Sequence, residues 1–101
     1  MEFIGMTSFR SNVTPEGRRE ALRVFSQWQP PEGLNMKLLY FSADGLRSFG
    51  LAETDNAALL TDVAARFSDY IDFEWIPVLP AQEAAAIAGQ ANAWVDQAKG
   101  G

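Results

Sequence analysis

The pattern of apolar and polar residues divides the chain into seven segments and predicts the element order β-α-β-β-α-β-α. Four segments are rich in apolar or alternating residues, as is typical of strands: 2–9, 34–43, 46–54 and 69–79. Three segments repeat apolar residues every three or four positions, as is typical of amphipathic helices: 14–28, 56–68 and about 81–98.

Capping residues and prolines set the expected helix boundaries. Thr14 is a good N-cap, and Pro15 is tolerated in the first helical position. The first helix should end before Pro30, because proline disfavours the helical conformation in the residue that precedes it. Asp55 is expected to cap the second helix, and Pro80 to start the last one.

A hairpin is predicted between the second and third strands, with Asp44-Gly45 as a two-residue type I′ turn. That turn would pair Tyr40 with Phe49, Leu38 with Leu51 and Met36 with Glu53. One face of the hairpin then carries apolar residues with a charge near each end: Met36, Leu38, Tyr40, Phe49 and Leu51, with Arg47 and Glu53. The other face carries Leu39, Phe41, Ser48, Gly50 and Ala52. Neither face is polar, so both should be covered.

The fold class that this order predicts is α+β, a ferredoxin-like βαββαβ sandwich followed by a C-terminal helix. The sheet order would be 4-1-3-2, with the first two helices on one face. We expect a single domain over residues 1–101. The other face of the sheet would be apolar and open, which a monomer tolerates poorly. A homodimer formed through this face is therefore expected, with the last helix bracing the sheet edge or crossing to the partner.

Composition narrows the chemistry. Asp and Glu number 13 against 8 Lys and Arg, so the net charge is −5, and no nucleic-acid or membrane partner is expected. Cys and His are both absent, which excludes disulfides, thiolate and imidazole catalysis, and most zinc, iron or haem sites. No metal and no cofactor are expected. The N-terminus has neither a basic start nor a long apolar run, so a cytoplasmic protein of bacterial type is expected.

The sequence resembles a known bacterial family along most of its length. The matching segments are Thr7-Ser8-Phe9, Pro30-Pro31-Glu32-Gly33, Lys37-Leu38-Leu39, Ala52-Glu53-Thr54-Asp55, Phe67 to Glu74, and Pro77-Val78. In order and spacing they are similar to the uncharacterised family called domain of unknown function 3303, of the dimeric α/β barrel fold group. The resemblance implies the fold and a dimer, and it implies no activity. The family pattern has Gly-Arg-Trp-His where this chain has Tyr40-Phe41-Ser42-Ala43, so any activity that used that His would be missing here.

Three residues on one face of the hairpin form the candidate binding site. Arg47 would hold an anionic or carbonyl group, while Glu53 or Tyr40 would move a proton. The alternative interpretation places Arg47 and Glu53 at opposite strand ends, with Tyr40 as an anchor in the dimer interface. A second candidate, Asp72 with Glu74, fits a solvated strand end better than a cation site.

The sequence leaves the function unknown, and two classes of function remain open. The first is a homodimeric module that binds a small apolar ligand or a protein partner. The second is a cofactor-independent monooxygenase or isomerase acting on a small aromatic or enolisable substrate, which rests on fold analogy alone. The aromatic residues do not decide between them, because Trp28, Trp75 and Trp94 all lie on apolar stripes and are expected in the core.

Overall fold

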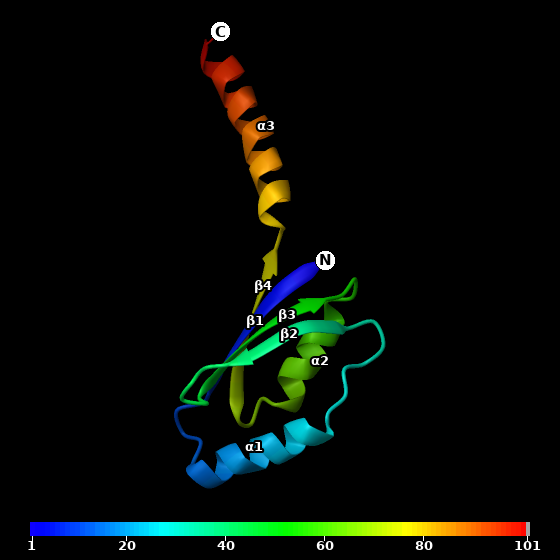
Figure 1. Cartoon of the computed structure of the whole chain (residues 1–101), viewed down its shortest axis with the longest axis vertical. Coiled ribbons are helices and arrows are strands. Elements are labelled where there is room, and N and C mark those ends of the chain that lie inside the picture. Colours follow the sequence, from blue (N-terminus) through cyan, green and yellow to red (C-terminus); the bar gives the residue numbers. More distant parts are fainter. Residues whose placement is uncertain (101) are drawn as a thin grey trace.

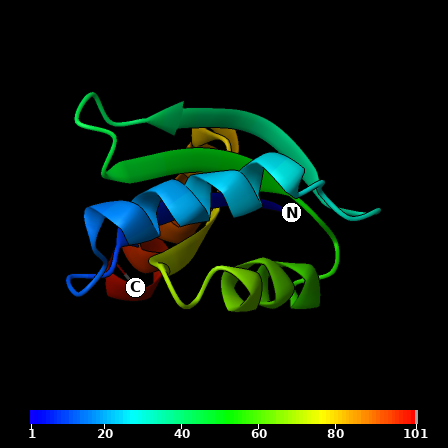
Figure 2. The same cartoon turned by 90° about the horizontal axis from the view of Figure 1, so that it is seen from below.

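Four antiparallel strands form one sheet in the computed structural model, which describes residues 1–100. The elements are β1 (Glu2–Phe9), α1 (Pro15–Gln27), β2 (Asn35–Phe41), β3 (Arg47–Glu53), α2 (Ala58–Arg66), β4 (Ile71–Val78) and α3 (Ala81–Gly100). The strand order is β2-β3-β1-β4, and α1 and α2 lie against one face of the sheet (Figure 1; Figure 2). The ferredoxin-like α+β prediction is confirmed.

The first helix begins where its capping residue predicts, and the second does not. Thr14 Oγ1 accepts a hydrogen bond from the Gly17 N–H at 3.0 Å, and Pro15 opens α1. Asp55, by contrast, does not cap α2; its carboxylate lies 3.4 Å from the N-terminal amine of Met1. Asn56 Oδ1 accepts from the Ala58 N–H at 3.1 Å instead, so the helix starts two residues later than expected.

The β2–β3 hairpin forms, but its turn differs from the predicted type I′ turn. The Gly45 N–H donates to the Ser42 carbonyl at 2.8 Å, and Gly45 is the one residue of the turn with a positive φ, of 75°. Asp44 keeps a negative φ and accepts hydrogen bonds from the Ser42 hydroxyl and the Leu46 N–H. The hydrogen bonds that the Asp44 side chain accepts stabilise a loop longer than two residues, in which Gly45 alone has the left-handed conformation.

A bulge in β2 corrects the predicted register at one end of the hairpin. Tyr40 pairs with Phe49 and Leu38 with Leu51, as expected. Met36, however, pairs with Ala52 and not with Glu53, because Lys37 is an extra residue in β2. Met36 therefore turns to the helix-covered side of the sheet and joins the residues packed on the core.

The core lies between the sheet and the helices and is centred on α2. Its buried members are Leu34, Ala52, Leu60, Val63 and Phe67. α2 contributes two of them, and Phe67 follows directly after it. α1 contributes much less, since Ala21 is its one buried residue. The sheet and α2 are therefore in closer contact than the sheet and α1.

The opposite face of the sheet, which we call the outer face, has no element of residues 1–100 packed over its centre. The strand register places its residues in four rows across the sheet. The two central rows are mostly apolar: Tyr40, Phe49, Met6 and Glu74, then Leu38, Leu51, Ile4 and Ile76. The rows at the two ends carry the charges Arg47 and Asp72 on one side and Glu2 and Glu53 on the other.

α3 projects away from the rest of the molecule as a continuation of β4 (Figure 1). None of its residues is buried, and Trp94 is 70% exposed. The chain measures 64 × 30 × 21 Å, with a radius of gyration of 18.4 Å, where a compact domain of this length has about 13 Å. Within this chain α3 neither braces the sheet edge nor covers the outer face. The expectation that Trp94 lies in the core is wrong for the single chain, whereas Trp28 and Trp75 do pack against the core.

Candidate functional site

Small residues at the centre of the sheet leave a cavity beneath the helices. On the helix-covered side, Gly5 of β1 pairs with Gly50 of β3, and Thr7 of β1 pairs with Ser48 of β3. The edge strands carry large side chains at the same level, and the Trp75 ring lies directly over Gly5, so the cavity lies between these side chains and the helices. The resulting cavity has a volume of about 290 Å³ and is partly open to solvent.

Aromatic rings surround this cavity in a continuous series. The rings run from β2 across α1 and the end of α2 to β4: Phe41, Phe25, Phe67, Phe73 and Trp75. Neighbouring ring centroids are 5.9 to 6.4 Å apart, within the range of favourable ring–ring contact. Trp28 adds a sixth ring, which contacts Phe25 and Phe67. The cavity wall is therefore apolar and consists of planar aromatic rings, which hold one another in place by ring–ring contacts.

Few polar side chains reach the cavity. Thr7 and Ser48 lie next to each other on its floor, where their hydroxyl oxygens are 2.5 Å apart and hydrogen-bonded. Arg47, at the start of β3, also borders the cavity, although its register position places its side chain on the outer face. Trp75 contributes a ring face, while its indole N–H is buried without a hydrogen-bond acceptor in the described part of the chain. No carboxylate lines the cavity among residues 1–100.

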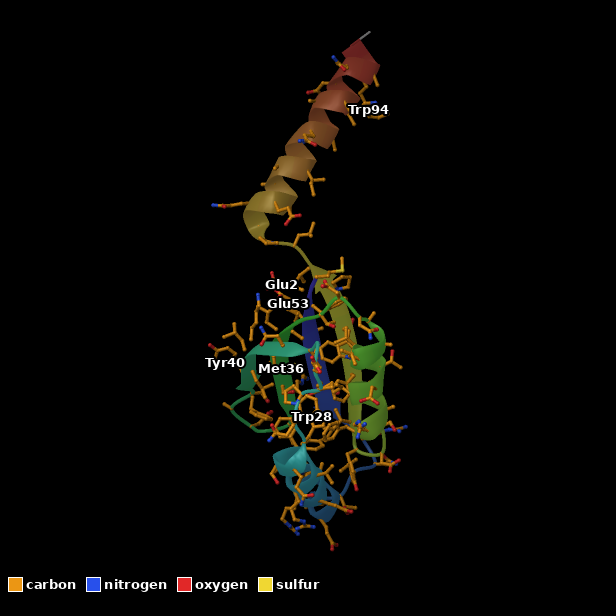
Figure 3. All side chains as sticks on the ribbon, turned by 90° about the vertical axis from the view of Figure 1, so that its right-hand side faces the viewer. Glu2, Trp28, Met36, Tyr40, Glu53 and Trp94 are labelled. Carbon is orange, nitrogen blue, oxygen red and sulfur yellow. The ribbon has the colours of Figure 1, made fainter. Side chains whose placement is uncertain are left out.

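The structure does not bring the three predicted site residues together. Tyr40 is 64% exposed on the outer face and points away from the sheet (Figure 3). Arg47 and Glu53 occupy the two ends of β3, six residues and therefore about 20 Å apart. Of the three, Arg47 alone borders the cavity. This placement matches the alternative interpretation of the sequence, in which the two charges lie at opposite strand ends.

Glu53 belongs instead to a small cluster of charges at the outer end of the sheet. Lys37 Nζ lies 2.8 Å from Glu53 and 3.3 Å from Glu2, and Figure 3 shows the two carboxylate residues side by side. The hydrogen bond from Lys37 lowers the pKa of Glu53. The hydrogen bonds to Glu53 and Glu2 raise the pKa of Lys37 in turn. Lys37 and Glu53 are exposed and Glu2 is partly exposed, so the cluster is a solvated ion network at the border of the outer face.

The other acidic candidate forms an ordinary surface contact. Asp72 lies 3.9 Å from the Arg10 guanidinium, and both side chains are exposed. Residues 1–100 contain no cluster of three or more acidic side chains arranged to hold a metal ion. In the same part of the chain, no helix combines the length and the apolar character that crossing a membrane requires.

Fold and site together define a class: a ferredoxin-like α+β domain with an aromatic-walled cavity on one side of its sheet and an uncovered apolar face on the other. Comparison with known protein families assigns the chain to one of them. Residues 1–92 match the family described as Domain of unknown function (DUF3303), and the chain belongs to this family. Neither a curated protein nor a solved structure matches the chain.

The sequence analysis missed the cavity because it looked for charged and catalytic side chains. The signal lay in the small residues instead. Gly5, Thr7, Ser48 and Gly50 fall at alternate positions on two strands that the predicted sheet order makes neighbours, and large aromatic residues flank them. Alternation alone would have placed these four residues on the same face.

Proposed function

We propose that this protein binds a small apolar ligand in the cavity between its sheet and helices, and that it works as a homodimer. The observation that carries the ligand-binding proposal is the cavity itself. Its volume of about 290 Å³ is close to the lower limit of typical ligand sites, which is about 300 Å³. Its lining is also typical of such sites, with aromatic walls and a few polar groups.

A binding role fits the cavity better than acid–base catalysis does. Proton transfer needs a titratable group within hydrogen-bond reach of the substrate. Among the described lining residues Arg47 is the one charged residue; its register position places its side chain on the outer face, and a guanidinium stays protonated in proteins. The oxygenase or isomerase alternative has no support from the comparisons, which match the chain to a family of unknown function.

Equilibrium dialysis with naphthalene tests the proposal. The full-length protein should take up naphthalene saturably. The Ala21→Leu variant adds three carbons to a buried residue that lines the cavity, and it should bind about tenfold more weakly. Ala65→Leu makes the same change at an exposed position of α2 outside the cavity and should bind like the parent protein. Circular dichroism confirms that each variant is folded. Absence of saturable binding, or equal binding by the Ala21→Leu protein, would refute the proposal.

The homodimer is supported by the pattern of the outer face. Two apolar rows in the centre with charged rows at both ends resemble the apolar core and polar rim of a protein interface. A two-fold axis perpendicular to the strands would place Arg47 of one chain near Glu53 of the partner subunit, so the end charges are complementary to a second copy. The second copy would also offer a surface to α3, none of whose residues is buried in the part of the chain that the structure describes.

Sedimentation equilibrium tests the dimer. The parent protein should be dimeric at micromolar concentration. Leu38→Glu places a carboxylate at a half-exposed position in the centre of the outer face and should shift the protein to monomer. Val24→Glu makes a comparable change on α1, at a residue that is 41% exposed and away from the outer face, and should leave the dimer intact. A monomeric parent protein would overturn this part of the proposal.

A cytoplasmic location in a bacterial cell belongs to the same proposal and is supported by the resemblance to a bacterial family.

A further inference from the structure

The hydroxyl pair on the cavity floor is the feature that distinguishes this cavity from a purely apolar one. Thr7 and Ser48 face each other across β1 and β3, and their side chains are partly buried. In the described part of the chain, the bond between them is the one side-chain hydrogen bond that either hydroxyl makes. Both therefore retain hydrogen-bonding capacity next to the empty volume.

The chemistry of two bonded hydroxyls fixes what they can still do. Each hydroxyl has one proton to donate and two lone pairs to accept with. The bond between Thr7 and Ser48 uses one of the two protons. The hydroxyl that accepts this bond keeps its own proton, so the pair can donate one further hydrogen bond and can also accept. A ligand oxygen placed above the pair would have a hydrogen-bond partner, whether it belongs to a hydroxyl or to a carbonyl group.

The walls restrict the rest of the ligand. Rings pack best against other rings in offset or edge-on arrangements, and Phe25, Phe41, Phe73 and Trp75 offer both faces and edges to the cavity. The volume of about 290 Å³ is small, which limits the ligand to roughly one or two fused rings. No carboxylate lines the cavity among residues 1–100, so a cationic ligand such as an amine would find no opposite charge there.

We infer that the ligand is a one- or two-ring aromatic compound with a hydroxyl or carbonyl oxygen, and that Thr7 and Ser48 bind this oxygen. The inference rests on the proposed ligand-binding function and specifies its chemical class. It assigns the two hydroxyls a role in selecting the ligand, beyond their contact with each other.

The test compares two probes that differ in one oxygen atom, 2-naphthol and naphthalene, by equilibrium dialysis against the full-length protein. Removing both hydroxyls with Thr7→Val and Ser48→Ala leaves the naphthol oxygen buried without a partner. A lost hydrogen bond of this kind corresponds to about a tenfold loss of affinity. We therefore expect 2-naphthol to bind about tenfold more weakly to the double variant, and naphthalene to bind as it does to the parent protein. Thr7→Ser keeps both hydroxyls and should keep the parent's ratio of the two affinities.

Each outcome has a distinct meaning. If both probes bind and their affinity ratio is the same in the parent and the double variant, the inference is wrong and the ligand-binding proposal stands. If both probes bind the double variant more weakly than the parent by the same factor, the hydroxyls only maintain the shape of the cavity, and the inference is wrong. If neither probe binds the parent protein, the ligand-binding proposal fails with it. Should the double variant not fold, Thr7→Ala combined with Ser48→Ala gives the same comparison, because it also removes both hydroxyls and leaves smaller side chains.

Discussion

Gly5 is the position where the packing of the cavity floor makes its sharpest prediction. A Cβ atom added to Gly5 would overlap the Trp75 ring, with Cε3 at 2.8 Å and Cη2 at 3.0 Å and Cζ3 closer still. Carbon atoms in ordinary contact are about 3.5–4.0 Å apart. Gly5 has a negative φ, so alanine meets no backbone strain there and the clash is purely between side chains.

The magnitude follows from two opposing effects. Overpacking a filled site costs about 1–3 kcal/mol. Replacing a strand glycine with alanine returns about 0.5–1 kcal/mol through lower backbone entropy in the unfolded chain. We therefore expect the Gly5→Ala substitution to lower the free energy of unfolding by about 1–2 kcal/mol. With a urea m-value of about 2 kcal/mol/M, the middle of the typical range, the unfolding midpoint should fall by roughly 0.5–1 M.

A double-mutant cycle with Trp75→Leu isolates the clash. Trp75→Leu is itself destabilising because it removes a large ring from the core. In that background the added Cβ meets no ring, so Gly5→Ala should be neutral or slightly stabilising, and the coupling energy should be about 1–3 kcal/mol. Urea unfolding of the four proteins at one fixed concentration measures it. An equal cost of Gly5→Ala in both backgrounds would show that the Trp75 ring does not lie over Gly5.

Three further predictions concern helix ends, α3 and charge. Thr14→Ala should lower the free energy of unfolding by about 1 kcal/mol, because the Gly17 N–H loses its acceptor; a thermal midpoint unchanged from the parent would contradict this. Gly89→Ala should favour helix by about 1 kcal/mol, since a side chain there meets open space, and far-UV circular dichroism should show more helix, not the same amount or less. Glu53 has a lowered pKa, so its contribution to stability is complete above its ordinary pKa of 4.5 and is lost as the pH falls through the lower folded value. The stability difference between the parent and Glu53→Gln, measured by urea unfolding, should therefore shrink on acidification; a difference independent of pH would refute the assignment.

Local signals in the sequence were sufficient for the order of elements and most of their boundaries. β1 spans the predicted residues 2–9, and Thr14 and Pro15 begin α1 where capping chemistry requires. Capping failed at α2 because several polar residues precede it. Asn56 could compete with Asp55 for the helix N–H groups, and Asp55 instead found a charge partner at the N-terminus.

The features missed by the sequence analysis depend on distant parts of the chain. The extra residue in β2 cannot be recognised from alternation, because Met36, Lys37 and Leu38 fit either register until the inner and outer faces are known. Trp94 lies on a good helical stripe, but a stripe does not say whether its partner is in the same chain. The pairing of Gly5 with Gly50 depends on the register of β1 against β3, which the predicted strand order alone does not give.

The bulge at Lys37 has a consequence for changes in chain length. In a regular strand, deletion of one residue turns every side chain beyond it to the opposite side of the sheet. Deletion of Lys37 would do the reverse: it would restore a regular ladder, with Met36 still opposite Ala52 and on the inner side. The same deletion would leave Glu2 and Glu53 adjacent without the ammonium group that now lies between them. At this one position the hairpin can therefore lose a residue while its other side chains keep their sides of the sheet. What the deletion removes is the pair of ion contacts from Lys37 to Glu2 and Glu53 at the end of the sheet.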